Sequence, residues 1–78
     1  MRINFPNQMA PNQLADILEI IIERGYPIQH RDYPVRNLTP SFIQNIRHDT
    51  EIAVYDTKNH FIIIEDEEEA LWFKLKYL

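Results

Sequence analysis

The longest periodic run of apolar positions lies between residues 11 and 24. Its apolar side chains recur at helical spacing: Leu14, Ile17, Leu18, Ile21 and Ile22. Such a stripe predicts an amphipathic helix over 11–24. Pro11 suits the first turn of this helix, where its missing N–H is no loss, and Gly25 suits the left-handed residue that ends it.

Two further helices are predicted from their start signals. Thr39 followed by Pro40 matches an N-cap with proline at the first helical position, which predicts a short amphipathic helix that ends near His48. Asp66 with Glu69 three residues later matches a capping box. The acidic residues there also suit the positive end of a helix dipole.

The segment after this capping box carries two patterns. Apolar side chains from Ala70 to Leu78 form a broad helical stripe, but residues 73–77 also alternate between apolar residues and lysines, as in a strand. We expect a helix, because its start signals are present. An extended conformation for the last few residues is the alternative.

Four segments show strand patterns, and the expected strands are residues 2–5, 26–33, 50–56 and 60–64. The first is expected at a sheet edge because Pro6 ends it, and the last is apolar on both faces, which is typical of a central strand covered on both sides. Residues 56–59 favour a turn, so 50–56 and 60–64 are predicted to form a hairpin. Residues 7–10 are expected to be a polar connection.

These elements predict an α+β domain in the order β-α-β-α-β-β-α, with helices packed on a small, mainly antiparallel sheet. The 78 residues allow a single domain, 1–78, that buries only roughly 60% of its unfolded surface. The chain has no cysteine, which favours a reducing cytoplasm. No apolar run approaches the roughly 20 residues of a membrane span, so no membrane association is expected.

Charge is unevenly distributed along the chain. The formal net charge is −4, and residues 65–69 are all acidic. Residues 24–48 contain four arginines and a single acidic residue, Asp32. Such a separation of charge steers partners more than it supports a fold.

The sequence gives little support for a catalytic site or a metal site. His30 and Asp32 would share one side of a strand, as a base and its orienting acid or as two metal ligands, but no third ligand is evident. Ser41 is the only serine and follows no glycine elbow, and one glycine cannot build a phosphate-binding loop. We therefore expect no enzyme, no metal and no cofactor. A small nuclease with His30 as acid/base is the remaining catalytic alternative.

The C-terminal region contains the first candidate binding surface. Its residues are Glu65, Asp66, Glu67, Glu68, Glu69 and Trp72. An acidic collar beside an apolar stripe with an aromatic anchor is typical of a protein interface. The expected partner is a larger protein, with a homodimer through the same surface as the alternative. A purely structural role of the acids at a helix start is the competing interpretation.

The segment 24–36 contains the second candidate surface. Its residues His30, Arg31, Tyr33 and Arg36 interleave basic and aromatic side chains. This pattern occurs in proteins that stack bases of single-stranded nucleic acids. Single-stranded nucleic-acid binding is therefore the second hypothesis for the function.

Residues 61–77, a strand followed by acids and a helix, resemble the ending of small accessory proteins of tailed bacteriophages. Such proteins are often acidic and free of cysteine. The resemblance covers about a quarter of the chain and carries over no catalytic residue. It implies a host-takeover or counter-defence role in the host cytoplasm, in which the protein acts as an inhibitor that binds one host protein and blocks or redirects it.

Overall fold

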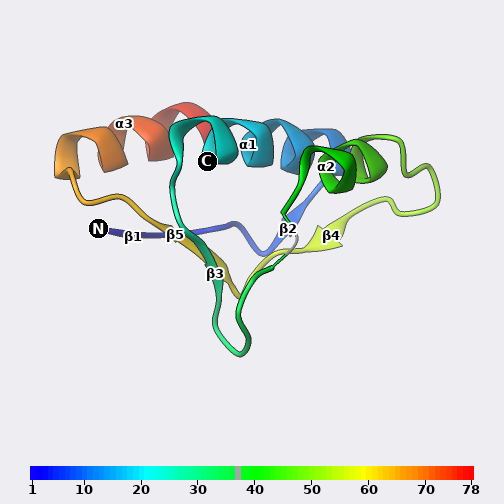
Figure 1. The fold of residues 1–78 in the computed structure, drawn as a ribbon, viewed down its shortest axis with the longest axis horizontal. Helices are drawn as coiled ribbons and strands as arrows, with labels where there is room; N and C mark the ends of the chain where they lie inside the picture. Colours follow the sequence, from blue (N-terminus) through cyan, green and yellow to red (C-terminus); the bar gives the residue numbers. More distant parts are fainter. Residues whose placement is uncertain (37) are drawn as a thin grey trace.

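Three helices lie on one side of two small antiparallel sheets in the computed structural model, which describes residues 1–36 and 38–78 (Figure 1). The helices are α1 (Pro11–Arg24), α2 (Pro40–Arg47) and α3 (Glu67–Tyr77). The strands are β1 (Arg2–Asn4), β2 (Gln8–Met9), β3 (Ile28–His30), β4 (Tyr55–Asp56) and β5 (His60–Ile63). The predicted α+β class and element order are confirmed, with β2 as an additional short strand.

The predicted helix ends are confirmed by their capping geometry. Gly25 adopts a left-handed φ of 72° after α1, and the Thr39 hydroxyl accepts a hydrogen bond from the Phe42 N–H at the start of α2. The Asp66 carboxylate accepts from the Glu69 N–H over 3.0 Å at the start of α3. Because α3 remains helical to Tyr77, the extended alternative for the last residues is wrong.

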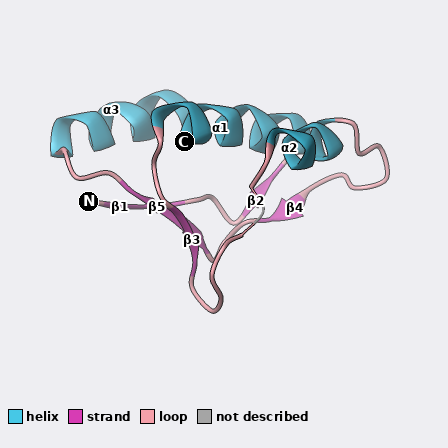
Figure 2. Cartoon of the chain, viewed as in Figure 1, coloured by secondary structure: helices cyan, strands magenta, loops and turns pink. Residues whose placement is uncertain are grey.

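β5 is the central strand of a three-stranded sheet, as predicted (Figure 2). It pairs antiparallel with β1 on one edge and β3 on the other, and Ile62 lies opposite both Ile3 and Ile28. Ile62 faces the helices and is fully buried. On the other face no second layer of helices is present among the described residues. There, the Arg2 guanidinium covers the Phe61 ring at 3.7 Å from its centroid.

The predicted hairpin across residues 56–60 is wrong. β4 pairs with β2 in a separate two-stranded sheet, with Met9 opposite Tyr55, and β5 pairs with β1 and β3 instead. A turn does follow Thr57, whose carbonyl accepts from the His60 N–H. However, Thr57 is buried and donates through its hydroxyl to the Pro6 carbonyl over 2.6 Å. The turn therefore carries the chain from one sheet to the other.

Three of the other predicted extended or connecting segments also differ from the structure. The expected strand 50–56 is reduced to β4, because the Asp49 carboxylate accepts from the Glu51 N–H and the Tyr55 hydroxyl and holds the intervening residues in a loop. The expected strand 26–33 is reduced to β3. The expected polar connection 7–10 contains β2, whose Met9 side chain is buried in the core.

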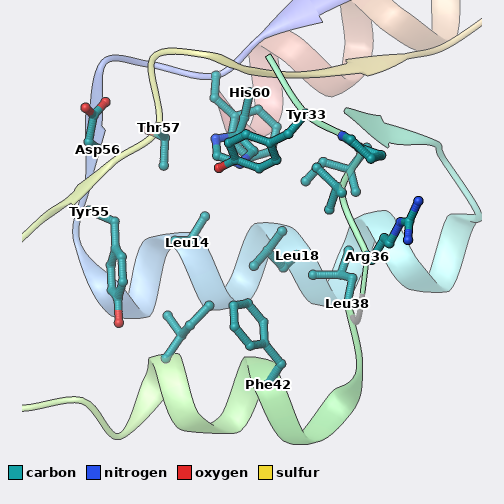
Figure 3. A pocket seen from close by; sticks show the side chains of 15 residues that line it. Leu14, Leu18, Tyr33, Arg36, Leu38, Phe42, Tyr55, Asp56, Thr57 and His60 are labelled. Carbon is teal, nitrogen blue, oxygen red and sulfur yellow. The ribbon is translucent and has the colours of Figure 1, made fainter. Parts of the chain in front are cut away.

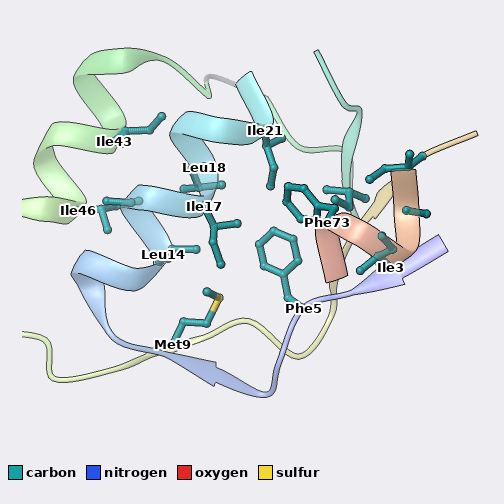
Figure 4. Close-up of a cluster of buried hydrophobic side chains, with 14 residues drawn as sticks. Ile3, Phe5, Met9, Leu14, Ile17, Leu18, Ile21, Ile43, Ile46 and Phe73 are labelled. Atoms are coloured by element: carbon teal, nitrogen blue, oxygen red, sulfur yellow. The ribbon is translucent and has the colours of Figure 1, made fainter. Parts of the chain in front are cut away.

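The core lies between α1, the sheets and the inner face of α3 (Figure 4). α2 covers the side of α1, where Arg47 forms ion pairs with Asp16 at 2.7 Å and with Glu19 at 2.9 Å. α3 contributes Ala70 and Phe73 to the same core. Within the described residues, no helix combines the length and apolar composition of a membrane span.

Candidate functional site

α3 is apolar on two faces, only one of which is packed. Ala70 and Phe73 on its inner face are fully buried. Its outer face exposes four large apolar side chains, which we call the α3 outer stripe: Leu71, Trp72, Leu75 and Leu78. Leu75 is 87% exposed. Large apolar side chains that gather on an exposed helix face are typical of interaction sites, so this stripe is a candidate contact surface.

Trp72 is held in place at the edge of this stripe. The Arg24 guanidinium lies 4.6 Å and the Lys76 ammonium 4.9 Å from its ring, and the Tyr77 ring meets it edge-on. These cation–π contacts restrict the indole without burying it. A partly exposed aromatic side chain with few accessible rotamers is suited to anchor an interface.

The acidic residues 65–69 divide into two groups. Asp66 caps α3, and Glu69 accepts a hydrogen bond from the Tyr26 hydroxyl and lies 3.8 Å from Arg24. Burial, followed by the hydrogen bond to Glu69, raises the pKa of Tyr26, so its hydroxyl remains a donor. The other three acids are exposed and have no ion-pair partner among the described residues: Glu65, Glu67 and Glu68.

The acidic and basic regions are not separated by the fold. Arg24, from the basic segment, reaches Glu69, and Arg47 pairs with two acids of α1. Arg31 and Arg36 are exposed and form no ion pair with any described residue. Half of the four arginines in residues 24–48 are therefore engaged within the molecule.

The second candidate surface lies at the end of β3 and in the following loop. The His30 and Tyr33 rings stack with centroids 3.7 Å apart, and Tyr33 is 54% exposed. The Asp32 N–H donates to His30 Nδ1 over 3.0 Å. His30 is thus oriented by the backbone of Asp32. A hydrogen bond to the Asp32 carboxylate, which a general-base pair would use, is absent among the described residues.

His60 is a residue that the sequence reasoning did not select. It lies opposite His30 in the β3–β5 register, with ring centroids 4.6 Å apart. Its Nδ1 is buried and has no hydrogen-bond partner among the described residues. Burial and, secondarily, the nearby His30 lower the pKa of His60, while Asp56 opposes this shift. The signal in the sequence that could have identified His60 is its position directly before the apolar run 61–64.

We expect acid to destabilise the protein through His60. The fold lowers the pKa of this imidazole below the ordinary value of 6.5 that applies in the unfolded chain. Below that pH the unfolded state takes up the proton first, so the free energy of unfolding falls as pH decreases. Urea unfolding at several pH values between 7.5 and 5 should show a shallower fall for His60→Gln. The exposed His48→Gln serves as the control, and equal slopes for all three proteins would contradict the role of His60.

Within residues 1–36 and 38–78, no group of three His, Asp or Glu side chains is placed to hold a metal ion. Comparisons with protein-family models, curated proteins and solved structures find no match to this chain. Function is therefore inferred from the surfaces of the chain itself.

Proposed function

We propose that this chain is a non-enzymatic protein-binding module that occupies a surface of a larger protein through the outer face of α3. The observation that carries this proposal is the exposure of Leu75 on a helix that is already fixed by Phe73 and Ala70. The inner face packs α3 against the core, whereas Leu71, Leu75 and Leu78 of the outer stripe remain exposed. Contiguous exposed apolar side chains on a small protein are typical of interaction sites.

The charges around the stripe define the chemistry of the partner. Glu65, Glu67 and Glu68 lie at the N-terminal end of α3, and Lys74 and Lys76 lie toward its C-terminal end. An apolar groove with basic side chains at one end would complement this arrangement. On the resemblance of residues 61–77 to phage accessory proteins, the partner would be a host protein that is blocked or redirected by the contact.

Variants of α3 test this proposal. A partner captured from bacterial lysate should persist after nuclease treatment. Its affinity should fall about tenfold or more for Leu75→Ala, because a central apolar contact is lost. Trp72→Ala should have a similar effect. The charge reversals Glu67→Lys and Glu68→Lys should together slow association and reduce its salt dependence.

Matched controls separate the interface from general surface effects. Glu23→Lys and Glu51→Lys reverse exposed charges outside α3 and should leave affinity unchanged. Circular dichroism should show the same fold for all these variants. Affinity unaltered by Leu75→Ala and Trp72→Ala would rule out this face. The isolated chain could instead sediment as a dimer that the Leu75→Ala substitution dissociates. That result would show that the α3 outer stripe binds a second copy of the chain.

Single-stranded nucleic-acid binding is the second candidate function, supported by one specific observation. Tyr33 is exposed while stacked on His30, and Arg31 and Arg36 are exposed on the same loop. One face of the tyrosine could therefore receive a base. This function predicts an affinity for single-stranded nucleic acid that falls steeply as the salt concentration rises. The substitution Tyr33→Ala should weaken that affinity. If the partners captured from lysate are lost after nuclease treatment, nucleic-acid binding would be favoured over the α3 interface.

A further inference from the structure

A cavity of about 430 Å³ lies between α1, α2, the loop after β3 and the start of β5 (Figure 3). This volume falls in the range of about 300–1,000 Å³ that is typical of small-molecule sites. No residue of α3 lines it, so it is separate from the surface of the proposed function.

The two sides of this cavity differ in chemistry. Leu14 and Leu18 of α1 and Phe42 of α2 form an apolar side, and Figure 3 shows Tyr33 and His60 across from them. Phe42 is 48% exposed although α2 already packs through its buried isoleucines. An apolar group in the cavity would cover this ring and remove apolar surface from water.

Three of the six polar side chains that line the cavity are already engaged. The Tyr55 hydroxyl donates to Asp49 over 2.9 Å, and the Thr57 hydroxyl donates to Pro6. The Asp56 carboxylate accepts from the Lys58 N–H and lies 3.8 Å from its ammonium. These three groups therefore already have partners within the chain.

Three lining groups keep their hydrogen-bonding capacity. The Tyr33 hydroxyl, the Arg36 guanidinium and the His60 imidazole have no hydrogen-bond partner among the described residues. Arg36 is also an exposed cation without an ion pair in that part of the chain. The guanidinium favours an anionic acceptor, and a planar carboxylate fits its fork of N–H donors.

The two charged residues of the lining, Asp56 and Arg36, would set the orientation of an anionic ligand in the cavity. Figure 3 shows Asp56 and Arg36 on opposite sides of the cavity. A carboxylate would be repelled at the Asp56 side and attracted at the Arg36 side.

We propose that this cavity binds a small molecule that carries an apolar chain and one carboxylate. The chain packs against Leu14, Leu18 and Phe42. The carboxylate accepts hydrogen bonds from Arg36 at the rim. One of the residues that the sequence marked for nucleic-acid binding would thus serve a small anionic ligand instead.

Octanoate and octan-1-ol, which differ in charge at equal chain length, are the probes for this site. Amide shifts in nuclear magnetic resonance should map octanoate to residues 33–36 and α2. Calorimetry should show that octan-1-ol binds about tenfold more weakly, since it lacks the charge-assisted bonds. Arg36→Met should bring octanoate to the affinity of octan-1-ol, whereas Arg31→Met, a matched change outside the cavity, should have no effect.

A second variant tests the apolar side. Phe42→Ala removes an exposed ring, so the protein should remain folded, and it should weaken both probes. The proposal is overturned if octanoate shifts no cavity residue, or if both probes bind the wild-type protein equally. It is also overturned if the shifts lie only on the α3 outer stripe, or if Phe42→Ala leaves both affinities unchanged.

Discussion

Phe73→Ala should lower the free energy of unfolding by about 3–5 kcal/mol, as expected for truncating a buried phenylalanine. Phe73 has no exposed surface and meets the Tyr26 ring edge-on with centroids 5.6 Å apart. Figure 4 shows its ring among side chains of α1 and the N-terminal segment, including Ile21 and Phe5. Because Ala70 is the only other fully buried side chain of α3, this ring is the main attachment of the helix among the described residues.

This loss is large for so small a domain. A chain of 78 residues is expected to have a total stability of about 4–12 kcal/mol. Urea unfolding followed by far-ultraviolet circular dichroism measures the change. Leu75→Ala, two residues away but 87% exposed, is the control and should stay within about 0.5 kcal/mol of wild type.

The same pair of variants distinguishes the two faces of α3. Phe73→Ala should lose stability, while Leu75→Ala should lose partner affinity at unchanged stability. A stability loss at Leu75 as large as that at Phe73 would show that the outer stripe is covered within the folded chain. The outer stripe would then no longer support an interface.

Met9→Ala should lower the free energy of unfolding by about 2–5 kcal/mol. Met9 is buried in β2 opposite Tyr55, and Figure 4 shows its side chain directed toward α1 near Leu14. A polar connection over residues 7–10, the interpretation from sequence alone, would make the same change nearly neutral. The size of the effect therefore separates the two descriptions of this segment.

Gln8→Ala is the matched control for Met9, because it lies on the same strand with an exposed side chain. Urea unfolding should show a change of less than about 0.5 kcal/mol for this control. A Met9→Ala protein as stable as Gln8→Ala would contradict the packing of β2 against the core. Thermal unfolding should rank the two variants in the same order.

Both binding surfaces could be anticipated only in part from the sequence. The acidic run and Trp72 were visible, but which acids are engaged within the fold depended on Tyr26 and Arg24, which are more than 40 residues away. The exposed leucines of α3 belonged to a broad apolar stripe in which the sequence did not distinguish packed from exposed side chains. The cavity was not visible at all, because its lining comes from segments spread over residues 5–60.

The three helices and their starts could be predicted from the sequence, as could the end of α1, whereas the C-terminal end of α3 could not. Pro11, Gly25, the Thr39–Pro40 pair and the Asp66 N-cap act through contacts within one or two turns, so these signals are local. The Glu69 side chain does not complete the predicted capping box, because it bonds to Tyr26 instead. The central place of β5 was also predicted correctly, but the expected cover on both faces was not, because helices of the described residues cover only one of them (Figure 1).

The pairing of the strands could not be predicted from the sequence and is seen only in the folded chain. β5 pairs with β1, some 60 residues earlier, and β4 pairs with β2, although a turn joins β4 directly to β5. Turn residues specify that the chain changes direction, but not which strand edge it then meets. That choice depends on burying Met9, Ile62 and Thr57 together around α1, and burial is a property of the whole fold.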